Sequence, residues 1–365
     1  MSYTIKSQPT TPNCTYTSLV YNVSSSNATQ PQFNYIMDVY LSGSVNRLAR
    51  IRQFPNPINE AVFDPSRILN DNLGYTLNFT TTAQLTNNNV RTFSIEFGEE
   101  FGTSSSSSLA VTSSISSSLL EVFPCSVDPN NGTSYNFIDS ASAVILSDRP
   151  NDVDEFEGVT ERISVYNGTG ISEDVTINYS LGGSTTQAVP AGEFYLISFP
   201  FAAPSSGSVT VSFGSDSFTK NYQPRCNYPT YNFHFINKYG VWENFSTNLP
   251  VRGNVSLDKQ NYTQTFVNYA SNGTYDLTRR GETNYSTGVE EDLTISTNWL
   301  NQSQANWITQ MIESDEVYLS VSPNNSTFKP IVITNASYVQ NTGRKDQKTF
   351  MYDVTFRYAN QRIGR

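Results

Sequence analysis

The chain has 365 residues, of which 13% are aromatic and 15% charged, and its formal net charge is −10. This length predicts two or three domains, each large enough to bury a core. An acidic chain without a basic stripe is unlike a DNA-binding protein. Few charges together with many Thr, Tyr, Phe and Asn are typical of strands and polar loops. We therefore expect an all-β fold with minor helix and no specific nucleic-acid binding.

Membrane insertion and secretion are not expected from the sequence. No stretch approaches the roughly 18 apolar residues that a membrane helix requires, and Met1-Ser-Tyr-Thr-Ile-Lys6 does not resemble a secretion signal. The three cysteines, Cys14, Cys125 and Cys226, are far apart and odd in number. We therefore expect neither a disulfide framework nor a zinc site, and synthesis in a reducing cytoplasm.

A first β domain is expected over residues 1–158. The polar residues 1–30 predict an arm that contains one strand, and Asp64 is the expected N-cap of a short helix at 65–73. The serine-rich stretch 99–118 predicts a loop. Alternation of apolar and polar residues predicts strands at 19–23, 33–41, 47–52, 75–82, 90–97, 119–123, 135–138 and 143–146, with the last three returning to the first sheet.

Acidic residues are concentrated in one segment of this domain. Between Glu99 and Glu161 there are eleven acids and one base, Arg149, which gives 1 − 11 = −10. Carboxylates repel phosphates, so such a segment suits the wall of a DNA conduit, but it would equally keep polar loops soluble. We expect part of the excess to face a lumen or the outer surface, without tight contact to DNA.

Two further domains are expected downstream. Five short alternating segments with Gly and Pro turns between them predict an immunoglobulin-like β-sandwich over 159–224. The aromatic stretch Tyr228–Phe245 then predicts the opening strand and corner of a C-terminal β domain over 225–365. This domain should contain one amphipathic helix at 297–313, with Thr297 as N-cap and one apolar face that includes Leu300, Trp307, Ile308, Met311 and Ile312.

Three sets of residues are candidate sites, and none predicts chemistry. His234 is the only histidine, but it alternates with aromatics in a strand and has no nucleophile motif near it. Asp152, Asp154 and Glu157 only approximate the spacing of a calcium loop, so a solvated acidic loop is the better interpretation. Glu290, Glu291 and Asp292 are adjacent and would alternate between strand faces. We expect no catalytic, cofactor-binding or metal-binding residues, and hence no enzyme.

Several patches resemble virion proteins of tailed bacteriophages, especially those infecting Bacteroidota. They are Phe33–Leu41, Phe54-Pro-Asn-Pro57, Val62–Leu69, Phe235–Trp242, Glu313–Tyr318, Pro330–Thr334 and Tyr352–Tyr358. They span most of the chain, although 159–224 is less familiar, and none is a catalytic motif. The resemblance implies a structural subunit of a tail, ring, hub or baseplate.

The expected function is thus a non-enzymatic virion subunit that forms a symmetric oligomer near the DNA conduit. Its expected partners are copies of itself and other virion proteins, and its expected location is the virion after synthesis in the host bacterial cytoplasm. The polar arm and the loop 99–118 are the segments expected to order at subunit contacts. The alternative is a receptor- or carbohydrate-binding virion protein, for which a glycan would be the partner.

Overall fold

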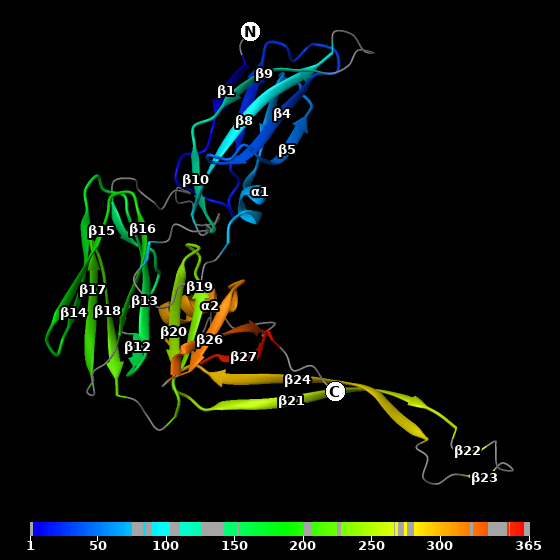
Figure 1. Ribbon diagram of the computed structural model, residues 1–365. Helices are drawn as coiled ribbons and strands as arrows, with labels where there is room; N and C mark the ends of the chain where they lie inside the picture. Colours follow the sequence, from blue (N-terminus) through cyan, green and yellow to red (C-terminus); the bar gives the residue numbers. More distant parts are fainter. Residues whose placement is uncertain are drawn as a thin grey trace.

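The computed structural model describes residues 3–360, except 75–82, 85–89, 103–109, 126–141, 152, 201–205, 225–227, 266, 269–273, 276–280, 322–323, 335–348 and 350. Within this part of the chain, strands dominate and two helices occur. The all-β fold with minor helix is confirmed. Figure 1 shows three β units and a long hairpin that projects from the third.

The N-terminal unit packs two sheets around one core. The smaller sheet has the order β1 (Tyr3–Ser7), β3 (Tyr21–Ser25), β6 (Glu60–Phe63). The larger has the order β2 (Asn13–Cys14), β10 (Leu120–Phe123), β8 (Arg91–Phe101), β4 (Asn34–Leu41), β5 (Arg47–Gln53), and β9 (Ala110–Ser116) also pairs with β8. The short helix α1 (Ser66–Asp71) buries Leu69 in the same core.

The described parts of the two segments expected to order at subunit contacts belong to this fold. Residues 3–7 form β1, whose Tyr3 and Ile5 pack against the core, so this part of the expected arm belongs to a sheet. The stretch 99–118 includes the end of β8 and all of β9, and Ile115 packs against the core. The serine-rich sequence predicted a loop, but partial burial of Ile115 and pairing with β8 make residues 110–116 a strand. The expected strands 75–82 and 135–138 lie outside the described residues.

The middle unit is an immunoglobulin-like β-sandwich. One sheet has the order β11 (Ala143–Ile145), β13 (Thr160–Asn167), β16 (Phe194–Pro200), β7 (Ala83–Gln84). The other has the order β12 (Val153–Phe156), β18 (Asp216–Gln223), β17 (Gly207–Phe213), β14 (Glu173–Tyr179), β15 (Ser184–Val189).

Three strands of this sandwich come from before the expected boundary at residue 158. They are β7, β11 and β12. The strand 143–146 therefore does not return to the first sheet as expected, because β11 pairs with β13. The domain limits 1–158, 159–224 and 225–365 stay a prediction, and a fragment meant to fold alone should include residues 142–158.

The C-terminal unit is a seven-stranded sheet with a helix packed on it. Its order is β20 (Trp242–Thr247), β19 (Tyr231–Ile236), β25 (Val317–Val321), β26 (Asn324–Ile333), β27 (Asp353–Tyr358), β24 (Glu282–Ser296), β21 (Val251–Thr263). The short strands β22 (Val267–Asn268) and β23 (Thr274–Tyr275) pair with each other.

The amphipathic helix α2 (Gln302–Ile312) buries Trp307, Ile308 and Met311 as expected. It begins five residues later than expected, and Thr297 is not its N-cap. The cap is Asn301, whose side chain accepts from the Gln304 backbone in a capping box, an arrangement that satisfies amide groups otherwise left open at a helix start. Thr297 instead accepts a hydrogen bond from the Tyr352 backbone at 2.9 Å.

The three units meet at one apolar cluster. It combines Cys14, Phe123 and Cys125 of the first unit with Tyr166 and Phe194 of the second and Trp242 of the third, among others. Cys14 and Cys125 form a disulfide, so the expectation of no disulfide was wrong. A sequence separation of 111 residues concealed the pair, since only the parallel pairing of β2 with β10 brings the two cysteines together.

A turn between β19 and β20 inserts into this junction. Gly240 has a φ of +72°, and a Cβ at this position would lie 1.9 Å from the Pro124 carbonyl oxygen. Only glycine adopts this conformation while allowing so close an approach. The expected corner at Tyr228–Phe245 is therefore where the C-terminal unit contacts the first unit.

Candidate functional site

His234 has a structural place in β19. It is 1% exposed, its Nε2 lies 3.0 Å from Ser320 Oγ, and its Nδ1 lies 3.4 Å from Arg162 Nη1. A catalytic triad would have a carboxylate where this guanidinium lies. Burial and, secondly, the charge of Arg162 hold the pKa of His234 well below its usual value. The histidine is therefore neutral and enclosed, and it lies where the C-terminal sheet meets the middle unit.

The acidic stretch around residue 155 is a strand rather than a solvated loop. Asp154 is exposed whereas Glu155 is fully buried, because neighbouring side chains of β12 point to opposite faces. Asp152 lies outside the described residues. No group of three or more His, Cys, Asp or Glu suited to a metal ion is found in the described part of the chain. Likewise, no helix among these residues is long and apolar enough to span a membrane.

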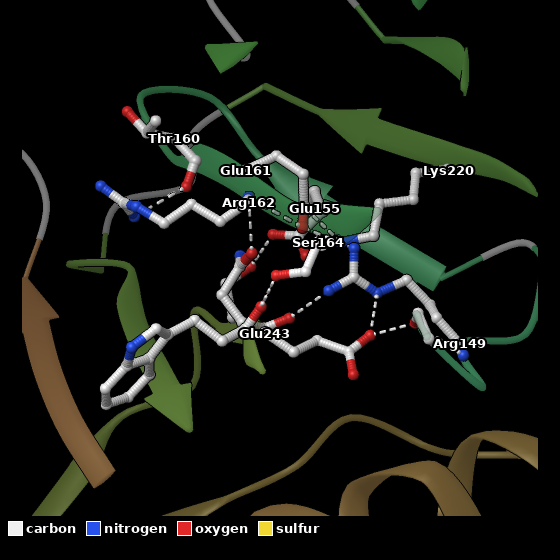
Figure 2. A network of polar contacts seen from close by, with 12 residues as sticks. Arg149, Glu155, Thr160, Glu161, Arg162, Ser164, Lys220 and Glu243 are labelled. Carbon is white, nitrogen blue, oxygen red and sulfur yellow. Dashed lines mark hydrogen bonds and ion pairs between the residues drawn. The ribbon is translucent and has the colours of Figure 1, made fainter. Parts of the chain in front are cut away.

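A buried ion network joins the middle unit to β20 of the C-terminal sheet (Figure 2). Glu161 of β13 is its centre, because it binds two cations at once. Its Oε1 accepts from Arg149 Nη1 at 2.5 Å, and its Oε2 contacts Lys220 Nζ. These three side chains are at most 1% exposed. Glu161 thereby couples the segment before β12 to β18.

Two more carboxylates complete the network. Glu155 of β12 accepts from Lys220 Nζ at 2.5 Å and also binds Ser246 Oγ of β20. Glu243 of β20 lies 3.2 Å from Arg149 Nε, and the Asn244 carbonyl accepts from Arg149 Nη2 at 2.9 Å. The middle unit is therefore attached to β20 through charge-assisted bonds that water does not reach.

Burial and neighbouring charges act against each other on these groups. Burial raises the pKa of Glu161, but the charges of Arg149 and Lys220 outweigh it and leave that pKa below its usual value. Burial dominates at Glu155, whose pKa is raised. Burial also lowers the pKa of nearby Arg162 to about 10. The arrangement can hold two β units in one orientation, and it presents no open position to a substrate.

This network accounts for much of the acidic segment. Of the eleven acids between Glu99 and Glu161, the structure describes eight, and Glu99, Glu100, Glu155 and Glu161 are buried. Glu100 pairs with Arg52 at 2.9 Å. These four carboxylates therefore do not contribute to the surface charge of the acidic segment, and they cannot line a lumen as expected for part of that segment.

The hairpin of β21 and β24 is exposed along most of its length. We call this hairpin the arm; it is not the polar N-terminal arm expected over residues 1–30. Figure 1 shows the hairpin extending away from all three units. The two strands pair from Val251 with Ile295 out to Thr263 with Glu282, whereas β27 pairs with β24 only over 292–296. Beyond this base, both edges of the two-stranded ribbon are open in the described strand order.

One face of the arm carries an apolar stripe that begins in the core. Ile295 is buried, and Val251 and Leu293 pack against the core. Farther out on the same face, Val255 is 57% exposed and Leu257 is 56% exposed. Directly opposite residues share a face, so Glu291, the partner of Val255, also lies on it. Glu290 lies on the other face, 3.6 Å from Arg357, as the adjacency of the acids predicted.

Neither the buried ion network nor the arm was predicted from the sequence. Lys220 had a usable signal, because it lies between Phe218 and Tyr222 at inward positions of an alternating strand. A charged residue at such a position indicates a buried partner. The arm had a weaker signal: its two long strands are mostly polar, with scattered apolar residues such as Val255 and Leu257.

Comparisons with known proteins give no family. No family model matches the sequence, and no curated protein is detectably similar. Fibronectin(III)-like modules of CbhA from Clostridium thermocellum are 10% identical over 61% of this chain and 95% of theirs, with a TM-score of 0.19. Trypsin-activated alpha-2-macroglobulin from Escherichia coli is 9% identical over 97% of this chain and 23% of its own, with a TM-score of 0.22. Domains 4 and 5 of the S-layer protein SbsC are 10% identical over 61% and 96%, with a TM-score of 0.19. Scores this low carry no argument about function.

Proposed function

We propose that the chain is a non-enzymatic structural subunit that assembles with copies of itself into a symmetric oligomer. The arm is the observation that carries this proposal. A two-stranded ribbon is marginally stable in water by itself, and open edges with exposed apolar side chains invite pairing with another chain. An arm with Val255 and Leu257 in water therefore gains stability when a neighbour covers it.

The virion assignment rests on the resemblance to tailed-phage structural proteins. We propose a tail, ring, hub or baseplate subunit, made in the host bacterial cytoplasm and found in the virion. Three β units that share an apolar cluster, two of them also joined by a buried ion network, with a projecting hairpin suit a subunit that binds neighbours in a fixed geometry. The Cys14–Cys125 disulfide is typical of proteins that work in oxidising surroundings, as a released particle does.

A receptor-binding role is the second candidate. Tyr262 and Tyr285 form an exposed aromatic pair toward the end of the arm, with ring centroids 6.2 Å apart. Aromatic faces of this kind can stack on sugar rings. A glycan-binding protein would bind an oligosaccharide array through this pair, whereas a subunit that works only by assembly would not.

Imaging of the purified protein tests the proposal. We expect closed rings or tubes of uniform size in negative-stain electron micrographs, because a contact repeated head to tail closes into a ring or extends as a filament. Peptides of this chain should also be found by mass spectrometry in purified phage particles whose genome encodes it. Isolated monomers at every concentration, together with absence from the particle, would refute the proposed function.

A further inference from the structure

A second exposed edge lies on the N-terminal unit. β5 is the last strand of its sheet, so one side of its backbone has no strand beside it among the described residues. It carries the densest group of bases in the described chain, Arg47, Arg50 and Arg52. The side chains of Arg47 and Arg52 are 41% and 55% exposed, although each also contacts an acid of its own unit, Asp38 and Glu100 respectively.

Apolar side chains flank this edge. Phe54 is 74% exposed, Ile58 70%, and Leu48 of β5 itself 40%. Phe54 lies just before a turn that carries Ile58. Asn56 closes this turn, because its Oδ1 accepts from the backbone of Ile58 at 3.0 Å and of Glu60 at 2.9 Å. We call β5 with Phe54 and this turn the basic edge. A turn whose backbone is already fixed loses less entropy when a partner covers it, which favours binding.

The arm complements the basic edge in three respects. Its strand β24 is open over residues 282–291, which is long enough to pair with all seven residues of β5. Its stripe of Val255 and Leu257 could cover apolar residues beside β5. At its base are three consecutive acids, Glu290, Glu291 and Asp292, of which the first two are exposed. Opposite charges on facing surfaces favour the correct pairing and register.

We propose that the arm of one copy docks along the basic edge of a second copy, with β24 adding a strand beside β5. This inference rests on the proposed function and names the surfaces by which that assembly occurs. The contact joins two different surfaces, so each copy has both a donor arm and an acceptor edge. Such a contact repeats from subunit to subunit until it closes.

A charge swap tests this docking. One variant carries Glu290→Lys and Glu291→Lys, a second carries Arg47→Glu and Arg52→Glu, and a third carries all four changes. We expect each of the first two to weaken self-association about tenfold or more, because reversal replaces attraction by repulsion. The third should recover most of the association, since the charges are again opposite. Sedimentation velocity over a concentration series measures the change.

Matched controls separate docking from general effects of charge and folding. Glu173→Lys with Asp174→Lys reverses two adjacent acids on β14, away from the arm, and should leave the association unchanged. Phe54→Ala should weaken association while Ile171→Ala, at a residue 66% exposed on the middle unit, should not. Circular dichroism and the unfolding midpoint check that each variant folds.

The outcomes distinguish the two proposals. If the wild-type chain forms no oligomer, the proposed function fails and the docking with it. If it forms oligomers that are indifferent to both reversals and to Phe54→Ala, the proposed function stands and the docking is wrong. If both reversals disrupt assembly but the four-fold variant does not recover, the arm and the edge contact other surfaces, and the docking is again refuted.

Discussion

Replacing Glu161 by alanine is expected to destabilise the protein by about 3–5 kcal/mol, the usual cost of removing one partner from a buried ion network. Glu161 is the carboxylate that Arg149 and Lys220 share. Without it, the two cations remain buried with Glu243 and Glu155 as their remaining acids. Neither Arg149 nor Lys220 can reach water, because both side chains are at most 1% exposed.

Urea unfolding followed by circular dichroism measures this loss. Glu161→Gln keeps the shape of the side chain but removes its charge, so it should also destabilise. Asp174→Ala is the matched control, because Asp174 is an exposed acid of the same unit and surface changes usually stay within about 0.5 kcal/mol. A loss below about 1 kcal/mol for Glu161→Ala would show that the network does not hold the middle unit to the C-terminal sheet.

The second large effect is expected at Trp307, where alanine should cost about 3–5 kcal/mol, the range for deleting a buried large aromatic. The indole is 1% exposed and lies between α2 and the sheet, with ring centroids 6.2 Å from Phe235 and 6.0 Å from Phe245. The Arg149 guanidinium lies 5.0 Å from the ring. The substitution therefore opens a cavity beside the ion network as well as within the C-terminal core.

Trp299 provides the matched control for this experiment. It is the same residue type, three residues before α2 begins, but it is 68% exposed. Trp299→Ala should change the free energy of unfolding by less than about 1 kcal/mol. Equal losses for the two variants would contradict the buried placement of Trp307 against the sheet.

Local patterns were sufficient to predict the regular elements. Alternation predicted β4 and β5 within one residue of their observed limits. Of the apolar face expected for the helix, Trp307, Ile308 and Met311 are buried in α2, Ile312 is only partly buried, and Leu300 is buried but precedes the helix. The start of α2 was wrong because Thr297 and Asn301 are both good caps, and only Asn301 has Gln304 three residues later to complete the box. β19 is buried on both faces from Asn232 to Ile236 although its residues alternate in the sequence. Phe233 and Phe235 share a core with α2, and His234 contacts Arg162 of the middle unit.

The disulfide and the ion network depend on contacts between segments that are far apart in the sequence, which local patterns do not reveal. Cys14 and Cys125 pair only because β2 lies beside β10. Glu161 belongs to the segment whose acids were expected in part at a lumen or the outer surface. Its partners Arg149 and Lys220 lie in other parts of the middle unit, and local sequence patterns do not bring them together. The arm gave no apolar face large enough for a core, which is the signal that sequence patterns detect best. What singles out the arm is that no other part of the described chain covers its exposed apolar residues.

Shortening the arm tests the central proposal of self-assembly most directly. Replacing residues 257–289 by Asn-Gly would close a two-residue turn between Ser256 and Glu290, which face each other in the hairpin. The pairing of β24 with β27 at the base is kept, so the monomer should remain folded with an unchanged unfolding midpoint. In sedimentation equilibrium, we predict oligomers for the full chain and monomers for the shortened chain at the same concentrations. Equal masses for the two chains would contradict the proposal that the arm builds the assembly.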